Sequence, residues 1–136
     1  MRLWERLASL ALVAVVDDLF FVVKIREAAR QAGVAVDIVS AAQFRPALES
    51  HAAKEAILEA VIVDLNSAAA LDVIGALRHD ARVGSPAVIG FVSHVAADVI
   101  SAARAAGCDQ VLARSAFAKQ LPEMLRKLTQ GSGTRG

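Results

Sequence analysis

The chain has 136 residues, which is the usual length of one domain and enough to bury a core without disulfides or metals. Hydrophobic residues make up 56% and charged residues 21%, a balance that excludes an intrinsically disordered chain. The 15 Lys and Arg nearly match the 14 Asp and Glu, so the charge gives no reason to expect a nucleic acid or a membrane as partner. The single cysteine, Cys108, excludes an internal disulfide and favours a reducing, cytoplasmic location.

The first apolar segment, Leu7–Val16, has the length of the apolar part of a secretory signal. Two features argue against a signal: the segment is followed by Asp17 and Asp18 and then by further apolar residues, and no cleavage site of small residues precedes a polar start of a mature chain. A membrane span needs about 20 apolar residues, and two aspartates in its middle would be costly. We therefore interpret Leu12–Val16 as a buried strand.

Five short apolar runs predict strands: Leu12–Val16, Val34–Val39, Ala60–Val63, Ala87–Val92 and Gln110–Leu112. They show little alternation of apolar and polar residues, which is typical of strands covered on both faces.

Five segments with helical spacing separate or follow these runs. They are marked, in chain order, by Phe21 to Ala32 with a stop at Gly33, by Phe44 and Leu48 with Pro46 near the first turn, by Leu71, Ile74 and Leu77, by Val95 to Ala106 with a stop at Gly107, and by Phe117, Leu121, Met124 and Leu128. Residues 131–136 read GSGTRG and predict a disordered tail after a single domain over residues 1–130.

This alternation of strands and helices predicts an α/β fold with a parallel sheet between two helical layers. The common solution for five units is the flavodoxin-like (βα)5 sandwich with strand order 2-1-3-4-5, whose functional crevice lies at the carboxyl ends of strands one and three.

Polar residues follow the predicted strands at that edge: Asp17 and Asp18, Asp64, Ser93 and Arg114. Three carboxylates would repel one another unless a cation lies among them, and oxygen ligands suit Mg²⁺. A nearby hydroxyl and guanidinium suit a bound phosphoryl group. The alternative is that each residue only caps a strand or the next helix.

With these motifs the chain resembles, from about Leu12 to Leu128, the receiver domains of two-component response regulators. The resemblance rests on the acidic pair Asp17-Asp18 and on the motifs VIVDLN, GFVS and GCDQVLARS. The intervals of 29 residues from Asp64 to Ser93 and 21 from Ser93 to Arg114 are close to those of the family.

The resemblance implies that Asp64 accepts a phosphoryl group from a sensor histidine kinase or a phosphotransfer protein. Asp17, Asp18 and Asp64, with the backbone carbonyl of Asn66, would hold Mg²⁺. Ser93 would contact the phosphoryl group and shift on activation, so that the fourth helix and fifth strand present a changed surface to a downstream protein.

The sequence departs from the family pattern at several positions. Arg114 and Ser115 replace the usual Lys and Pro, Val111 replaces the aromatic switch residue, and the loop of residues 67–70 has neither Pro nor Gly. Arg keeps the charge of Lys but not its compact shape. A second reading is therefore a pseudo-receiver that acts as a phosphorylation-independent protein-interaction module.

A third reading is a small hydrolase or phosphatase that uses Asp64, for which His94 is the single nearby acid–base candidate. The chain has no glycine-rich phosphate loop, and its histidines and Cys108 lack the spacing of metal ligands. We expect a signalling protein rather than an enzyme.

Overall fold

The computed structural model describes residues 10–54 and 57–134. Its five strands are β1 (Leu10–Val15), β2 (Ala35–Val39), β3 (Ile57–Asp64), β4 (Ala87–Val92) and β5 (Gln110–Ala113). They form one parallel sheet in the order β2-β1-β3-β4-β5, which confirms the predicted flavodoxin-like topology.

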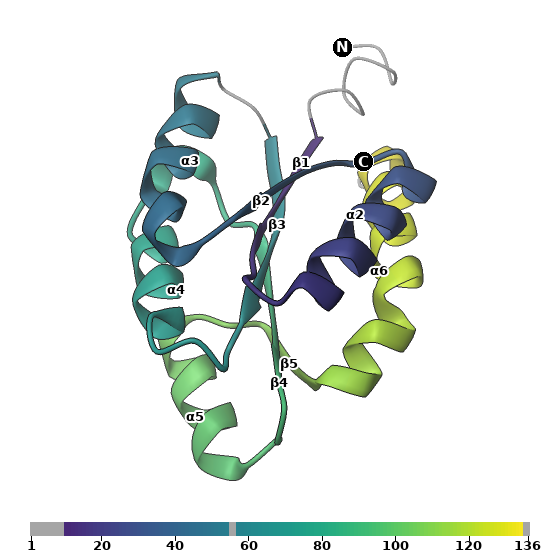
Figure 1. Cartoon of the computed structure of the whole chain (residues 1–136). Coiled ribbons are helices and arrows are strands. Elements are labelled where there is room, and N and C mark those ends of the chain that lie inside the picture. The colour runs from purple at the N-terminus through teal and green to yellow at the C-terminus, as the bar shows by residue number, and fades with distance from the viewer. Residues whose placement is uncertain (1–9, 55–56, 135–136) are drawn as a thin grey trace.

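The helices form a layer on each face of this sheet (Figure 1). They are α2 (Leu19–Ala32), α3 (Ala41–Ala53), α4 (Ala70–Arg78), the 3₁₀ turn η1 (Ala81–Val83), α5 (Ala97–Ala106) and α6 (Arg114–Thr134). Helices α2 and α6 cover one face, and α3, α4 and α5 cover the other. Among the helices in the described ranges, none is both long enough and apolar enough to span a bilayer.

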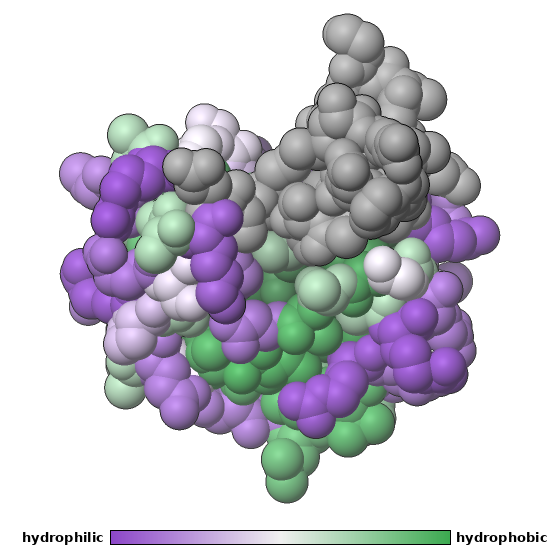
Figure 2. All heavy atoms as spheres, turned by 90° about the horizontal axis from the view of Figure 1, so that it is seen from above, coloured by the Kyte–Doolittle hydropathy of each residue, from purple (hydrophilic) through white to green (hydrophobic). Residues whose placement is uncertain are grey.

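The central strands are buried on both faces, as their continuous apolar sequences require. In β1, Val13 and Val15 pack in the cluster that includes α3 and α4, while Leu12 and Ala14 pack in the cluster that includes α2 and α6. Viewed from above, hydrophobic side chains are visible between two flanking regions that are mostly hydrophilic (Figure 2). The core is therefore divided into two halves by the sheet.

The ends of two helices follow from local sequence signals. Asp18 caps the start of α2, and Gly33 ends it in the left-handed region with φ 73°. Ser40 and Gln43 form a capping box that starts α3 earlier than we expected, so Pro46 lies beyond the first turn of that helix.

The structure differs from the predicted helix faces at three positions: Leu71, Val95 and Ala102, the last of which is exposed on α5. Leu71 is 44% exposed, because the buried face of α4 is formed by Ala70, Val73, Ile74 and Leu77. Val95 is 45% exposed and precedes α5, which begins at Ala97.

Helix α6 runs to Thr134, four residues into the segment 131–136 that the sequence predicts to be disordered. Extending an established helix costs far less than starting one, so the packed turns before residue 129 can carry this extension. Residues 135–136 of the predicted tail lie outside the described residues.

Candidate functional site at the carboxyl ends of the strands

The structure brings the predicted site residues to one edge of the sheet. Asp17 and Asp18 follow β1, Asp64 is the last residue of β3, and Ser93 follows β4. Arg114 is the first residue of α6, directly after β5. Because β1, β3, β4 and β5 are consecutive neighbours in a parallel sheet, their carboxyl ends line this one edge.

Asp18 uses both carboxylate oxygens within the protein. Its Oδ1 accepts a hydrogen bond of 2.9 Å from the backbone N–H of Phe20, which caps α2. Its Oδ2 accepts a hydrogen bond of 2.8 Å from Nη2 of Arg114. The Asp18–Arg114 ion pair therefore joins the first helix of the described chain to the last.

The Arg114 guanidinium is also held by an aromatic ring. Its carbon Cζ lies 4.9 Å from the centroid of Phe21. Phe91 lies 4.6 Å from Phe21 and 4.6 Å from Phe117, measured between ring centroids. All three rings are buried, so the guanidinium rests on a packed part of the core.

Asp64 is linked to Ser93 through the side chain of Asn66. Oδ1 of Asp64 accepts hydrogen bonds from the backbone N–H of Asn66 at 2.9 Å and from its Nδ2 at 2.8 Å. Oδ1 of Asn66 accepts a hydrogen bond of 3.2 Å from the backbone N–H of Ser93. Sequence reasoning had assigned only the backbone carbonyl of Asn66, although the Asp-x-Asn spacing is a common signal for such a local turn.

The loop after Asp64 is fixed by packing on β4. Leu65 donates its backbone N–H to the carbonyl oxygen of Phe91 at 2.8 Å. Its side chain lies over Gly90, where an added Cβ would lie 2.6 Å from Cδ1 of Leu65. Gly90 thus provides the space that lets the residue after Asp64 pack closely on the sheet.

The donor chemistry of this edge suits a hard divalent cation, since the carboxylates of Asp17, Asp18 and Asp64 offer only oxygen. The positions of these carboxylates suit a metal ion less well than their chemistry does. Within residues 10–54 and 57–134, no three His, Cys, Asp or Glu side chains lie close enough to hold a metal ion together. Asp18 is bound to Arg114 instead.

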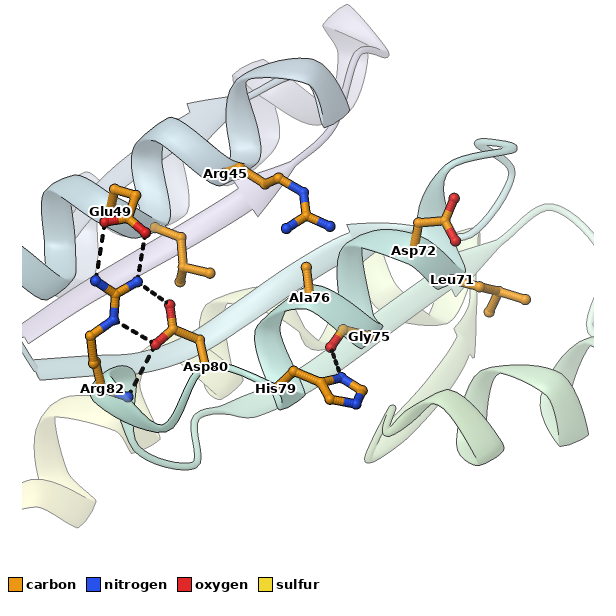
Figure 3. Close-up of a pocket in the computed structure, with 10 residues that line it drawn as sticks. Arg45, Glu49, Leu71, Asp72, Gly75, Ala76, His79, Asp80 and Arg82 are labelled. Atoms are coloured by element: carbon orange, nitrogen blue, oxygen red, sulfur yellow. Dashed lines mark hydrogen bonds and ion pairs between the residues drawn. The ribbon is translucent and has the colours of Figure 1, made fainter.

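A cleft with a volume of about 920 Å³ lies elsewhere, between α3, α4 and η1 (Figure 3). In it, Nη2 of Arg82 lies 2.6 Å from Oε1 of Glu49 and 2.7 Å from Oδ2 of Asp80. The hydrogen bonds from Arg82 lower the pKa of both carboxyl groups below their usual values. Arg82 is therefore already bound between two carboxylates, whereas Arg45, which also lines the cleft, makes no ion pair with the other residues drawn in Figure 3.

His94, the acid–base candidate for a hydrolase, is exposed and is not hydrogen-bonded to Asp64 within the described chain. Cys108 is buried near the opposite end of β5, as expected for a small apolar residue.

At the level of sequence, neither a family model nor a curated protein matches the chain. At the level of structure, it is similar to solved response regulators. A response regulator from Thermotoga maritima has a TM-score of 0.71 at 16% identity, over 88% of this chain and 97% of that one. One from Hahella chejuensis has a TM-score of 0.73 at 16% identity, over 87% and 93%.

The Mn²⁺-bound form of the response regulator Rcp1 is also similar, with a TM-score of 0.68 at 13% identity, over 93% of this chain and 96% of that one. These likenesses cover nearly the whole fold at low identity. The chain therefore has the fold of response regulator receiver domains.

Proposed function

We propose that the chain is a receiver module of a two-component pathway, which accepts a phosphoryl group on Asp64 and signals by binding a partner. The observation that carries this proposal is the group formed by Asp64, the acidic pair after β1, the Asn66–Ser93 link and Arg114 at one edge of a receiver fold. We propose a signalling role in the cytoplasm rather than an enzymatic one.

The hydrogen bonds of Asp64 favour one of its two oxygens as the nucleophile. Both donations from Asn66 go to Oδ1, so Oδ2 is the oxygen that would attack. With a phosphohistidine donor, an O–P bond to Asp64 forms and the P–N bond breaks. The electron pair of that bond stays on the imidazole nitrogen of the donor, and because the other ring nitrogen carries a proton, a neutral histidine leaves.

Mg²⁺ is the cation we propose for this edge, held by Asp17, Asp18, Asp64 and the carbonyl oxygen of Asn66. When bound, it would neutralise the carboxylates and the phosphoryl oxygens. The presence of Mn²⁺ in the structurally similar Rcp1 supports a divalent ion. Ser93 would contact the phosphoryl group through its hydroxyl, and Arg114 would pair with its oxygens.

A protein donor is supported by the surface beside Asp18. Leu19, Phe20 and Val23, at the start of α2, are 78%, 57% and 66% exposed. Exposed apolar side chains of this size next to the acidic pair favour contact with a protein over a small solute. We propose a sensor histidine kinase or phosphotransfer protein here, and a downstream protein at α5 and β5.

The test is intact-mass measurement after incubation with Mg²⁺ and acetyl phosphate. The wild-type chain is expected to gain one base-labile phosphoryl group, and Asp64→Asn none. Asp72→Asn is the matched control, because Asp72 is an exposed aspartate at the start of α4, and it should gain the group as the wild type does. Modification of Asp64→Asn at the wild-type level would refute the assignment of Asp64.

The pseudo-receiver is the second candidate, and one observation favours it. Arg114 already neutralises Asp18 without any added cation. If neither acetyl phosphate nor a phosphorylated phosphotransfer protein modifies Asp64, and the folded chain binds no Mg²⁺, the pseudo-receiver is the better account.

A further inference from the structure

The strongest unassigned feature of the site is the position of Arg114. In the proposed function this residue pairs with a phosphoryl group, yet its Nη2 donates to Oδ2 of Asp18 at 2.8 Å. Asp18 is one of the carboxylates assigned to the divalent cation. The carboxylate of Asp18 is therefore bound to the Arg114 guanidinium in the structure and assigned to a divalent cation in the proposed function.

The ion pair is built into the fold on both sides. Asp18 is oriented by the hydrogen bond from the N–H of Phe20 to its other oxygen. The guanidinium is oriented by the face of Phe21, at 4.9 Å, and Phe21 itself is 2% exposed and packs against Phe91 with ring centroids 4.6 Å apart. Because both partners are held before they meet, little side-chain entropy is lost in forming the pair.

A divalent cation on the acidic pair would meet the charge of Arg114 at close range. Like charges that share one carboxylate repel, and the partly buried setting of Asp18 and Arg114 screens them less than open water does. Asp17, Asp18 and Asp64 together carry three negative charges, of which Arg114 neutralises one. The pair thus lowers the attraction of this edge for a metal ion.

We infer that Arg114 sets the metal affinity of this site, because its guanidinium occupies Asp18 and must leave before a divalent cation can bind there. The inference rests on the proposed function only for the assignment of the three aspartates to a cation. By linkage, whatever draws Arg114 away from Asp18 strengthens metal binding, and a phosphoryl group on Asp64 has the charge to do so.

The experiment measures Mn²⁺ binding alone, without any phosphodonor. Mn²⁺ is titrated into the purified chain, and the free ion is followed by its electron paramagnetic resonance signal. Arg114→Met removes the charge and keeps a long side chain, and Arg114→Gln is a polar alternative should the first variant fold poorly by circular dichroism. Arg104→Met is the matched control, since Arg104 is exposed in the last turn of α5 and away from the acidic pair.

Arg114→Met is expected to bind Mn²⁺ about fivefold more tightly than the wild type, or better. Arg104→Met should bind as the wild type does, and adding Asp18→Asn to Arg114→Met should remove the gain. A smaller gain in the folded Arg114 variants, a gain that survives Asp18→Asn, or no Mn²⁺ binding in any variant overturns the inference.

This result is separate from the test of the proposed function. Mass measurement reports whether Asp64 is phosphorylated in the wild type, and the Mn²⁺ titration reports whether Arg114 opposes the cation. Either can fail while the other succeeds.

Discussion

At the scale of single residues, Asn66 connects two residues of the candidate site that the sequence pattern did not connect. An aromatic residue on β5 is absent, since Val111 occupies that position and is only partly buried. The amide of Asn66 instead joins the carboxylate of Asp64 to the backbone of Ser93. A charge added to Asp64 would change the hydrogen bond that Nδ2 of Asn66 donates to it. Because the same amide accepts the N–H of Ser93, the hydrogen bond at the start of the β4–α5 loop would change as well.

Cys108 provides a residue-scale prediction on reactivity. Burial raises the pKa of its thiol, and Sγ donates to the carbonyl oxygen of Gln110 at 3.1 Å. A raised pKa means that less thiolate is present at pH 8 than in an exposed cysteine, and the thiolate is the reactive form. We expect Ellman's reagent to react at least about a hundredfold more slowly with the native chain than with the chain in urea.

Absorbance at the wavelength of the released dye measures both rates on one sample. Comparable rates in the two conditions would contradict the prediction, because they would mean that Cys108 is open to solvent in the native chain.

The sequence predicted where the site residues lie but not what they contact. Asp64, Ser93 and Arg114 could be placed from the ends of buried strands, because a parallel sheet brings those ends together. The ion pair of Asp18 with Arg114 spans most of the chain. Its geometry depends on the packing of Phe21, which no local pattern reports.

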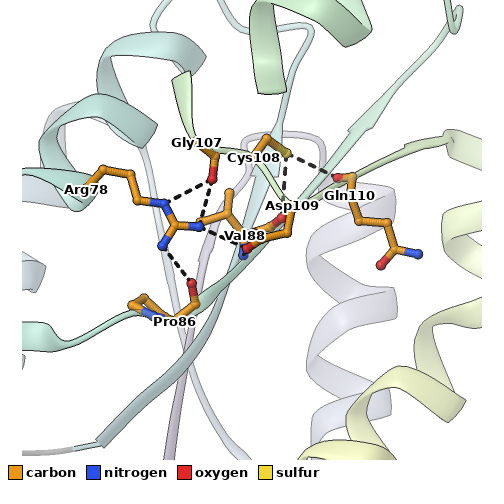
Figure 4. Close-up of polar contacts among 7 residues, drawn as sticks. All are labelled: Arg78, Pro86, Val88, Gly107, Cys108, Asp109 and Gln110. Atoms are coloured by element: carbon orange, nitrogen blue, oxygen red, sulfur yellow. Dashed lines mark hydrogen bonds and ion pairs between the residues drawn. The ribbon is translucent and has the colours of Figure 1, made fainter. Parts of the chain in front are cut away.

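At the scale of elements, Arg78 joins three segments at the edge of the sheet opposite the candidate site (Figure 4). Its guanidinium donates to the carbonyl oxygens of Gly107 and Pro86 and, at 2.9 Å, to Oδ2 of Asp109. The same Asp109 oxygen accepts the backbone N–H of Val88 at 2.8 Å. The end of α4, the start of β4 and the loop before β5 are thereby held together.

Arg78→Met is expected to lower the free energy of unfolding by about 2–3 kcal/mol, because it leaves partly buried carbonyl oxygens without their donor. Urea unfolding followed by circular dichroism measures this loss. Arg104→Met is the control with the same change of side chain, and it should unfold as the wild type does, since Arg104 is exposed. Equal midpoints for the two variants would show that the Arg78 contacts contribute little.

Elements with long apolar or branched side chains were the easiest to predict. The order of strands and helices was confirmed along the whole described chain, since its strands are nearly continuous runs of Val, Ile, Leu and Ala. The predicted buried face of α4 was wrong at Leu71, because alanines such as Ala70 fit buried and exposed positions alike. On such a helix, tertiary packing determines which of two neighbouring rows of side chains is buried.

At the scale of the whole molecule, the two helical layers are anchored unequally. Helix α2 buries Phe21, Ile25, Ala28 and Ala29 and is capped by Asp18. Helix α5 buries only Ala103, and its N-cap residue Ala96 makes no side-chain hydrogen bond to the helix. The α5 side of the molecule therefore has less apolar burial to oppose local opening.

This asymmetry predicts the order of amide hydrogen exchange. Peptides that cover α5 should exchange at least about tenfold faster than peptides that cover α2, because both the missing cap and the shallow burial favour opening of α5. Mass spectrometry of pepsin fragments after timed exposure to deuterated buffer measures both helices in one experiment. Equal protection would contradict the prediction. Faster exchange in α5 would mean that the helix following Ser93 changes its packing at a lower cost than α2, which is what the proposed output surface requires.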